Sequence, residues 1–167
     1  MWLDLATCEN IYNTFRTEFK LNGDEPLPEF KHRYPGKLES ILESIKLRYG
    51  QMETAASVGQ IAASYFTHIT KSQALVNGNK RMGVLFTTVF LSLNNLELEL
   101  SQQRVTDLSL LVATSKAKLP KVVELITPVF EDTIKQQSAS FRETVTKIVR
   151  DYVARLPNIK FPSWQRK

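Results

Sequence analysis

The chain has 167 residues, of which 43% are hydrophobic and 23% are charged, and its formal net charge is +5. This length and composition are typical of one globular domain with its own core, so we expect a single domain over residues 1–167, and the mild positive charge does not indicate a nucleic-acid partner. One cysteine, Cys8, and two histidines exclude an internal disulfide, are too few for a typical structural zinc site, and suit a reducing compartment.

The first part of the chain reads as two helices separated by a loop. Residues 7–20 carry apolar side chains at helical spacing, which predicts an amphipathic helix with Thr7 as the candidate N-cap. A glycine and three prolines interrupt residues 22–36, so we expect a loop or a short hairpin there. A second amphipathic helix is predicted from about Gly36 to Gly50.

The next two helices are predicted to form the hydrophobic core. Residues 52–71 have a wide apolar face and lead into a polar loop over residues 72–78. The middle of residues 79–94 is apolar on nearly every side, which predicts a buried helix at the centre of the bundle. The apolar run 84–93 is too short to cross a membrane, and the first residues lack the features of a signal peptide. We therefore expect a cytoplasmic protein without a membrane partner.

The remaining elements complete an all-α prediction. Residues 96–100 alternate Leu and Glu and predict a short extended piece. Helices are predicted over residues 102–115 and from Pro120 onward, with a kink or break at Pro128. A last helix is predicted over residues 141–153, followed by a basic tail. The expected fold is thus a helical bundle around a buried central helix, with one small flap or hairpin.

The most informative stretch is residues 77–81, which read Asn-Gly-Asn-Lys-Arg. The glycine lets the backbone turn, and the free N–H groups and the dipole of the following helix favour an anion. Lysine and arginine add the charges that bind phosphate oxygens. Cations at a helix N-terminus are unfavourable unless an anion joins them. We therefore expect phosphate to bind at Gly78, Asn79, Lys80 and Arg81.

Residues 73–81 read Gln-Ala-Leu-Val-Asn-Gly-Asn-Lys-Arg and resemble the core motif of the Fic/Doc family, His-x-Phe-x-Asp/Glu-Gly-Asn-Gly/Lys-Arg. Lys80 makes the stretch similar to the death-on-curing branch of that family. Further similarity to the helices that flank the motif lies in residues 35–42, 62–71 and 90–94. The resemblance covers about residues 22–130 and leaves a C-terminal helical extension over residues 131–167.

The resemblance implies transfer of AMP from ATP, or of phosphate in the death-on-curing branch, to a protein hydroxyl. It also implies a general base at position 73, a Mg²⁺ ligand at position 77, and a flap over residues 22–36 that docks the target. The base position holds Gln73, whose amide takes up no proton near neutral pH, and loss of a general base costs about 10²–10⁴-fold in rate. The metal position holds Asn77, a weaker partner for Mg²⁺ than a carboxylate.

We therefore expect a degenerate family member that binds ATP or another nucleotide at residues 78–81 and has lost or weakened group transfer. One alternative is an active nucleotidyl- or phosphotransferase, acting on a protein hydroxyl, that uses water or His68 as base. His68 lies five residues before Gln73 on the preceding helix, which places it more than a turn from the loop. A second alternative is a non-enzymatic interaction module of a toxin–antitoxin-like system, with a protein target or antitoxin-like regulator as partner.

Overall fold

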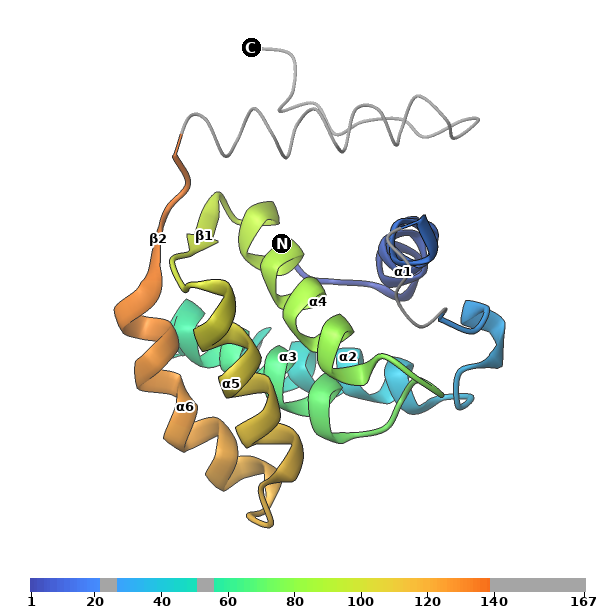
Figure 1. The fold of residues 1–167 in the computed structure, drawn as a ribbon. Helices are drawn as coiled ribbons and strands as arrows, with labels where there is room; N and C mark the ends of the chain where they lie inside the picture. The colour runs from blue at the N-terminus through green and yellow to red at the C-terminus, as the bar shows by residue number, and fades with distance from the viewer. Residues whose placement is uncertain (22–26, 51–55, 139–167) are drawn as a thin grey trace.

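A computed structural model describes residues 1–21, 27–50 and 56–138 of the chain (Figure 1). In these ranges the chain forms helices joined by loops, with one pair of short strands. In chain order the elements are α1 (Leu5–Leu21), the 3₁₀ turn η1 (Phe30–His32), α2 (Lys37–Gly50), α3 (Val58–Lys71), α4 (Asn79–Leu93), β1 (Leu96–Leu98), α5 (Gln102–Thr114), α6 (Leu119–Thr133) and β2 (Ile134–Gln136). The predicted all-α class, with a small two-stranded element, is confirmed.

Helix α3 lies at the centre of the bundle and packs against α2, α4, α5 and α6. Its buried apolar side chains point in several directions; they are Ala62, Ala63, Tyr65, Phe66 and Ile69. Helix α4 is also largely buried, but several of its apolar side chains remain half-exposed. The central position that the sequence suggested for α4 therefore belongs to α3, and α4 is its principal partner. In Figure 1, α1 lies on one side of the bundle and α5 and α6 lie on the other.

Hydroxyl and carboxyl side chains set several helix starts. Asp4 accepts a hydrogen bond from the Thr7 N–H at 2.7 Å, so Asp4, and not Thr7, provides the cap of α1. Ser57 caps α3 in the same way, by accepting from the Gln60 N–H at 3.1 Å. Helix α3 therefore begins at Val58, later than predicted, while residues 51–55 lie outside the described part of the chain.

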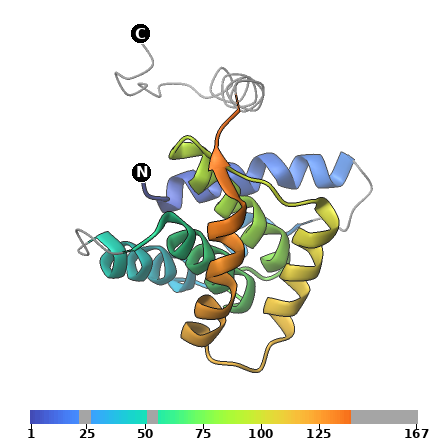
Figure 2. The ribbon, with the colours of Figure 1, turned by 90° about the vertical axis from the view of Figure 1, so that its left-hand side faces the viewer.

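The two strands come from distant parts of the chain. β1 pairs antiparallel with β2, with Leu96 opposite Gln136 and Leu98 opposite Ile134. Figure 2 shows α6 leading directly into β2 beside the end of α4. The extended piece predicted over residues 96–100 is therefore β1. Of the loop or short hairpin expected over residues 22–36, the described residues 27–36 form a loop that contains the turn η1.

The C-terminal half differs from the expectation in two places. Helix α6 continues through Pro128 to Thr133, so of the kink or break expected at this proline the break does not occur. Residues 131–136, which we placed in an extension, complete α6 and form β2. The predicted helix over residues 141–153 lies outside the described residues. Within the described ranges, the combination of length and apolarity needed to cross a membrane occurs in no helix.

Candidate functional site

The loop between α3 and α4 turns through two residues with left-handed backbone. Gln73 has φ of 50° and Gly78 has φ of 83°. Glycine adopts this conformation without the steric cost that a side chain brings, which explains why the loop has a glycine immediately before α4. The Gln73 side chain is exposed, and between the two turning residues Ala74 and Leu75 are buried. The loop thus exposes Gln73 to solvent, while Ala74 and Leu75 anchor it in the core.

Asn79, the first residue of α4, fixes this loop with its side chain. Its Oδ1 accepts from the Leu75 N–H at 2.9 Å, and its Nδ2 donates to the Leu75 carbonyl oxygen at 2.7 Å. Both backbone groups of a buried residue are therefore satisfied by a single amide. The side chain of Asn79 is thus engaged within the protein, and what this residue offers to a ligand is its backbone N–H.

Asn77 and Gly78 are also engaged with neighbouring groups of the chain. The Asn77 Oδ1 accepts from the Gly78 N–H at 2.6 Å. A Cβ at Gly78 would lie only 2.5 Å from Cδ2 of Leu27, a side chain that is 2% exposed. The open face of the glycine is therefore filled by Leu27. The N–H groups that remain at the start of α4 are those of Asn79 and Lys80, which have no acceptor among the described residues.

The segment around Leu27 is held over the loop by α1. Arg16 donates from Nε to the Leu27 carbonyl oxygen at 2.9 Å, and the Tyr12 hydroxyl donates to the Pro28 carbonyl oxygen at 3.0 Å. Further along, the Tyr34 N–H donates to the Ala74 carbonyl oxygen at 3.1 Å. The segment is therefore fixed against both α1 and the loop, and the side chains of α1 that hold it were not identified from the sequence.

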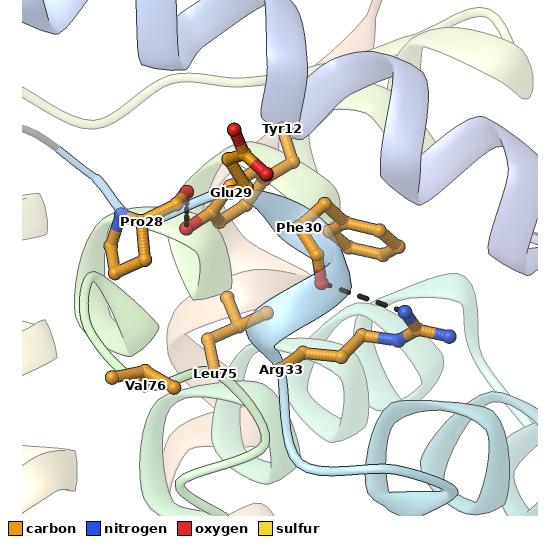
Figure 3. A pocket seen from close by; sticks show the side chains of 7 residues that line it. All are labelled: Tyr12, Pro28, Glu29, Phe30, Arg33, Leu75 and Val76. Carbon is orange, nitrogen blue, oxygen red and sulfur yellow. Dashed lines mark hydrogen bonds between the residues drawn. The ribbon is translucent and has the colours of Figure 1, made fainter.

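A narrow crevice lies between this segment and the loop (Figure 3). Phe30 fills one side of it, with its ring 5.3 Å from that of Tyr12 and 4.5 Å from the Arg33 guanidinium, while Leu75 and Val76 form the opposite side. The space between its lining atoms is about 150 Å³, open solvent included, and it leaves no room even for a water molecule. It has no room for a nucleotide base.

Cationic side chains gather at the start of α4. Lys80 is exposed and Arg81 is half-buried. Burial raises the pKa of Tyr12, and the positive charges of Arg16 and Arg81 oppose that rise, so both guanidinium groups act on the same phenol. No acidic residue occupies the first turn of α4. The surface at this helix end is therefore positive, as the sequence pattern predicted.

The residues present do not suit Mg²⁺. The Asn77 oxygen that would replace the family's carboxylate is occupied by the Gly78 N–H at 2.6 Å. Nor do the described residues bring together three His, Cys, Asp or Glu side chains in a group that could hold a metal. A hard dication prefers several oxygen ligands, carboxylates above all. We therefore assign no metal-dependent step to this loop.

His68 belongs to a different part of the surface. Its Nδ1 donates to the Ser64 carbonyl oxygen at 2.8 Å, one turn earlier in α3. The side chain lines a groove shared with residues of α2 and α6, and it does not line the crevice beside the loop. This placement gives no support to His68 as a base acting in place of Gln73.

No protein-family model matches the chain, and a search of curated proteins finds no relative.

Proposed function

We propose that this chain is a degenerate Fic/Doc-like module that binds a phosphoryl group at the start of α4 and has lost or weakened group transfer. The observation that carries the proposal is the fixed first turn of α4. The left-handed Gly78 and the two hydrogen bonds between Asn79 and Leu75 hold that turn in place. The backbone N–H groups of Asn79 and Lys80 lie in this turn together with the exposed Lys80 side chain, and the turn has no acidic residue. Such a helix start favours an anion.

The space around Gly78 favours a ligand that binds at the surface through its phosphoryl group. Leu27 fills the face of Gly78, and the neighbouring crevice has only about 150 Å³ of empty space. A bound nucleotide would therefore place its phosphate on α4 and leave its base in solvent. We expect modest affinity, because most of such a ligand stays hydrated.

The chemistry of the loop favours holding a phosphate over transferring it. Gln73 is exposed and carries no titratable group at the position of the family's base. The Asn77 oxygen is already hydrogen-bonded to its neighbour. The loop therefore lacks two contributions on which such a transfer depends, general-base catalysis and metal-ion catalysis.

Calorimetry with inorganic phosphate, AMP and ATP, each with and without Mg²⁺, tests the binding. We expect ATP to bind equally well in both conditions, and Lys80→Ala to weaken binding about 10-fold, the scale of one charge-assisted hydrogen bond. Lys116→Ala, an exposed lysine between α5 and α6, is the matched control and should bind normally. Arg81→Ala should also weaken binding, once its melting temperature has been compared with that of the natural chain. No heat with the natural chain would end the phosphate proposal.

The loss of transfer needs a separate experiment. Labelled ATP, carrying the label in either the AMP or the terminal phosphate, is incubated with the chain and a protein extract. The natural chain should label nothing, and Gln73→His combined with Asn77→Asp should restore labelling if the rest of the site is intact. Labelling by the natural chain would show instead that the protein is an active nucleotidyl- or phosphotransferase.

The closed crevice favours a second candidate, a non-enzymatic interaction module of the toxin–antitoxin type. In that case the segment over the loop packs as a permanent surface, and Leu27 on Gly78 is part of a filled site. The two candidates differ in calorimetry, since the interaction module binds no ATP. The two candidates also predict different effects of Lys80→Ala. This substitution weakens phosphate binding, but an interaction module keeps its protein partner unless that partner contacts the first turn of α4.

A further inference from the structure

A second concave surface, separate from the crevice beside the loop, is bounded by α2, α3 and α6. It is an open groove of about 620 Å³, within the roughly 300–1,000 Å³ range of small-molecule sites. Its walls are three helices of the core, so its shape is fixed by packing and does not depend on a loop. It is much larger than the crevice beside Leu75 and shares no lining residue with it.

The inner wall of the groove is ordered and largely apolar. The Tyr49 hydroxyl and the Ser64 Oγ lie 2.8 Å apart in a buried hydrogen bond, which fixes the tyrosine ring against α3. Val123 of α6 is also buried, with 6% of its surface exposed. The lining also includes the exposed Pro120 and Pro128, so a planar apolar group placed in the groove would cover carbon atoms.

The rim of the groove is cationic. Arg48 of α2, Lys118 just before α6 and Lys121 of α6 line it and are exposed, and Glu124 is the one carboxylate among its described lining residues. Lys121 pairs with Glu124 at 2.7 Å, but both side chains are more than half exposed, so water screens this pair. The first turn of α6 has no acidic residue to balance its lysines. The rim therefore has an excess of positive charge around an apolar wall.

His68 reports on the charge inside the groove. Its Nδ1 donates to the Ser64 carbonyl oxygen, which leaves Nε2 as the proton acceptor of the neutral ring. Burial lowers the pKa of His68, the bond to Ser64 opposes this, and the positive charge of Arg48 lowers it further. The other charged groups that line the groove with it are the two lysines and the glutamate of α6. An anion held between these cations would stabilise the imidazolium form.

We propose that this groove binds a small organic anion, one with a carboxylate or sulfonate head on a flat apolar body. The head pairs with Arg48 and Lys121, and the body lies along the floor of the groove against the exposed lining residues Pro120 and Pro128. The proposal is independent of phosphate binding at α4, because the two sites share no residue.

The probe that tests this is 8-anilinonaphthalene-1-sulfonate, with the uncharged N-phenyl-1-naphthylamine as its matched control. Binding is measured by fluorescence on the full chain, and its location by NMR of the histidine ring protons. The chain has only two histidines, His68 in the groove and His32 in η1, so His32 is an internal control. We expect the sulfonate to move the His68 resonance and raise its pKa, while the His32 resonance stays in place.

Substitutions then test the role of charge. Arg48→Ala and Lys121→Glu should each weaken sulfonate binding about 10-fold, while Arg104→Ala on the exposed face of α5 should not. All these side chains are exposed, and far-ultraviolet circular dichroism confirms that each variant is folded. The proposal is overturned if the uncharged probe binds as tightly as the sulfonate, if both histidines or neither respond, or if neither rim substitution weakens binding.

Discussion

Gly78 and Gly36 share a left-handed backbone but differ in what surrounds them, and this difference predicts the cost of replacing each. Their φ angles are 83° and 73°. A Cβ at Gly78 would lie 2.5 Å from Leu27, whereas a Cβ at Gly36 would meet nothing within 4 Å. Gly36→Ala should therefore cost only the backbone strain, about 1 kcal/mol, and Gly78→Ala about 2–4 kcal/mol.

Urea denaturation of the two variants measures these free energies of unfolding. The clash has its own test, since Leu27→Ala combined with Gly78→Ala should cost less than the sum of the two single changes. Equal losses for the two glycine variants would mean that Leu27 moves aside freely and that only the backbone matters.

The amide of Asn79 predicts a second residue-scale effect. Asn79→Ala removes both hydrogen bonds to Leu75 and leaves a buried N–H and a carbonyl without their partner, a loss of about 2–3 kcal/mol. Asn79→Asp keeps the acceptor, and its charge is favourable in the first turn of a helix, so it should lose less. The free energies of unfolding of the two variants check this order. If aspartate is as damaging as alanine, the donation to the carbonyl is the dominant bond.

Sequence reasoning at this scale succeeded where a single residue type determines the conformation. The turn at Gly78 and the position of the α4 start follow from glycine and from the helical pattern after it. The partners of these residues did not follow. Asn79 was assigned to a ligand, yet its side chain bonds with Leu75, four residues earlier, and Leu27 comes from a segment about 50 residues away. Such contacts depend on the tertiary fold, which a local pattern does not contain.

At the scale of elements, α3 and α4 pack closely against each other at Gly83. A Cβ there would lie 2.2 Å from the Thr70 Oγ1 and 3.2 Å from the Phe66 carbonyl oxygen. Gly83→Ala should therefore destabilise the protein by about 1–3 kcal/mol, although alanine has the higher helix propensity. Combining it with Thr70→Ala should recover part of the loss. Gly50→Ala in α2, whose Cβ would lie 3.7 Å from Trp2, is the control and should cost little. Thermal melting monitored by circular dichroism distinguishes these variants.

The existence of the helices was predictable, but some of their ends and the identity of the central helix were not. Apolar periodicity located α2, α4 and α5 to within a few residues. It placed α4 at the centre because the middle of α4 is apolar all round, while α3, with small Ala62 and Ala63, permits closer packing on more sides. Of the kink or break expected at Pro128, the break does not occur, since a proline removes one hydrogen bond of a helix without necessarily ending it.

For the whole molecule, Cys8 predicts how stability depends on alkaline pH. Its thiol is fully buried, and burial raises its pKa from 9.0 to about 12. Below pH 9 the thiol is protonated in both the folded and the unfolded chain, so its contribution is constant. Above pH 9 the unfolded chain releases this proton and the folded chain does not, so stability falls by up to about 1.4 kcal/mol for each pH unit.

Urea denaturation at pH 8 and pH 10 measures this loss, and Cys8→Ala should show a shallower fall over the same interval. Tyr65, whose pKa burial raises to about 12, adds a similar loss that begins near pH 10 and remains in the variant. If the two chains lose stability equally, the Cys8 thiol ionises as readily in the folded protein as in the unfolded one.

The pairing of β1 with β2 has a consequence for the rate at which the protein unfolds. The ladder joins Leu96 to Gln136, and it is extended by the Glu99 N–H, which donates to the Thr133 carbonyl oxygen at 2.8 Å. Helices α3 and α4 are separated by a short loop and can pair early, but the ladder forms only after α5 and α6 have brought distant strands together. We therefore expect Ile134→Ala to speed unfolding in stopped-flow experiments while leaving the folding rate nearly unchanged. A slower folding rate would instead place this pairing in the transition state. If folding is unchanged, the β1–β2 pairing is the last contact to form, and its strength sets how long the native protein persists before it unfolds.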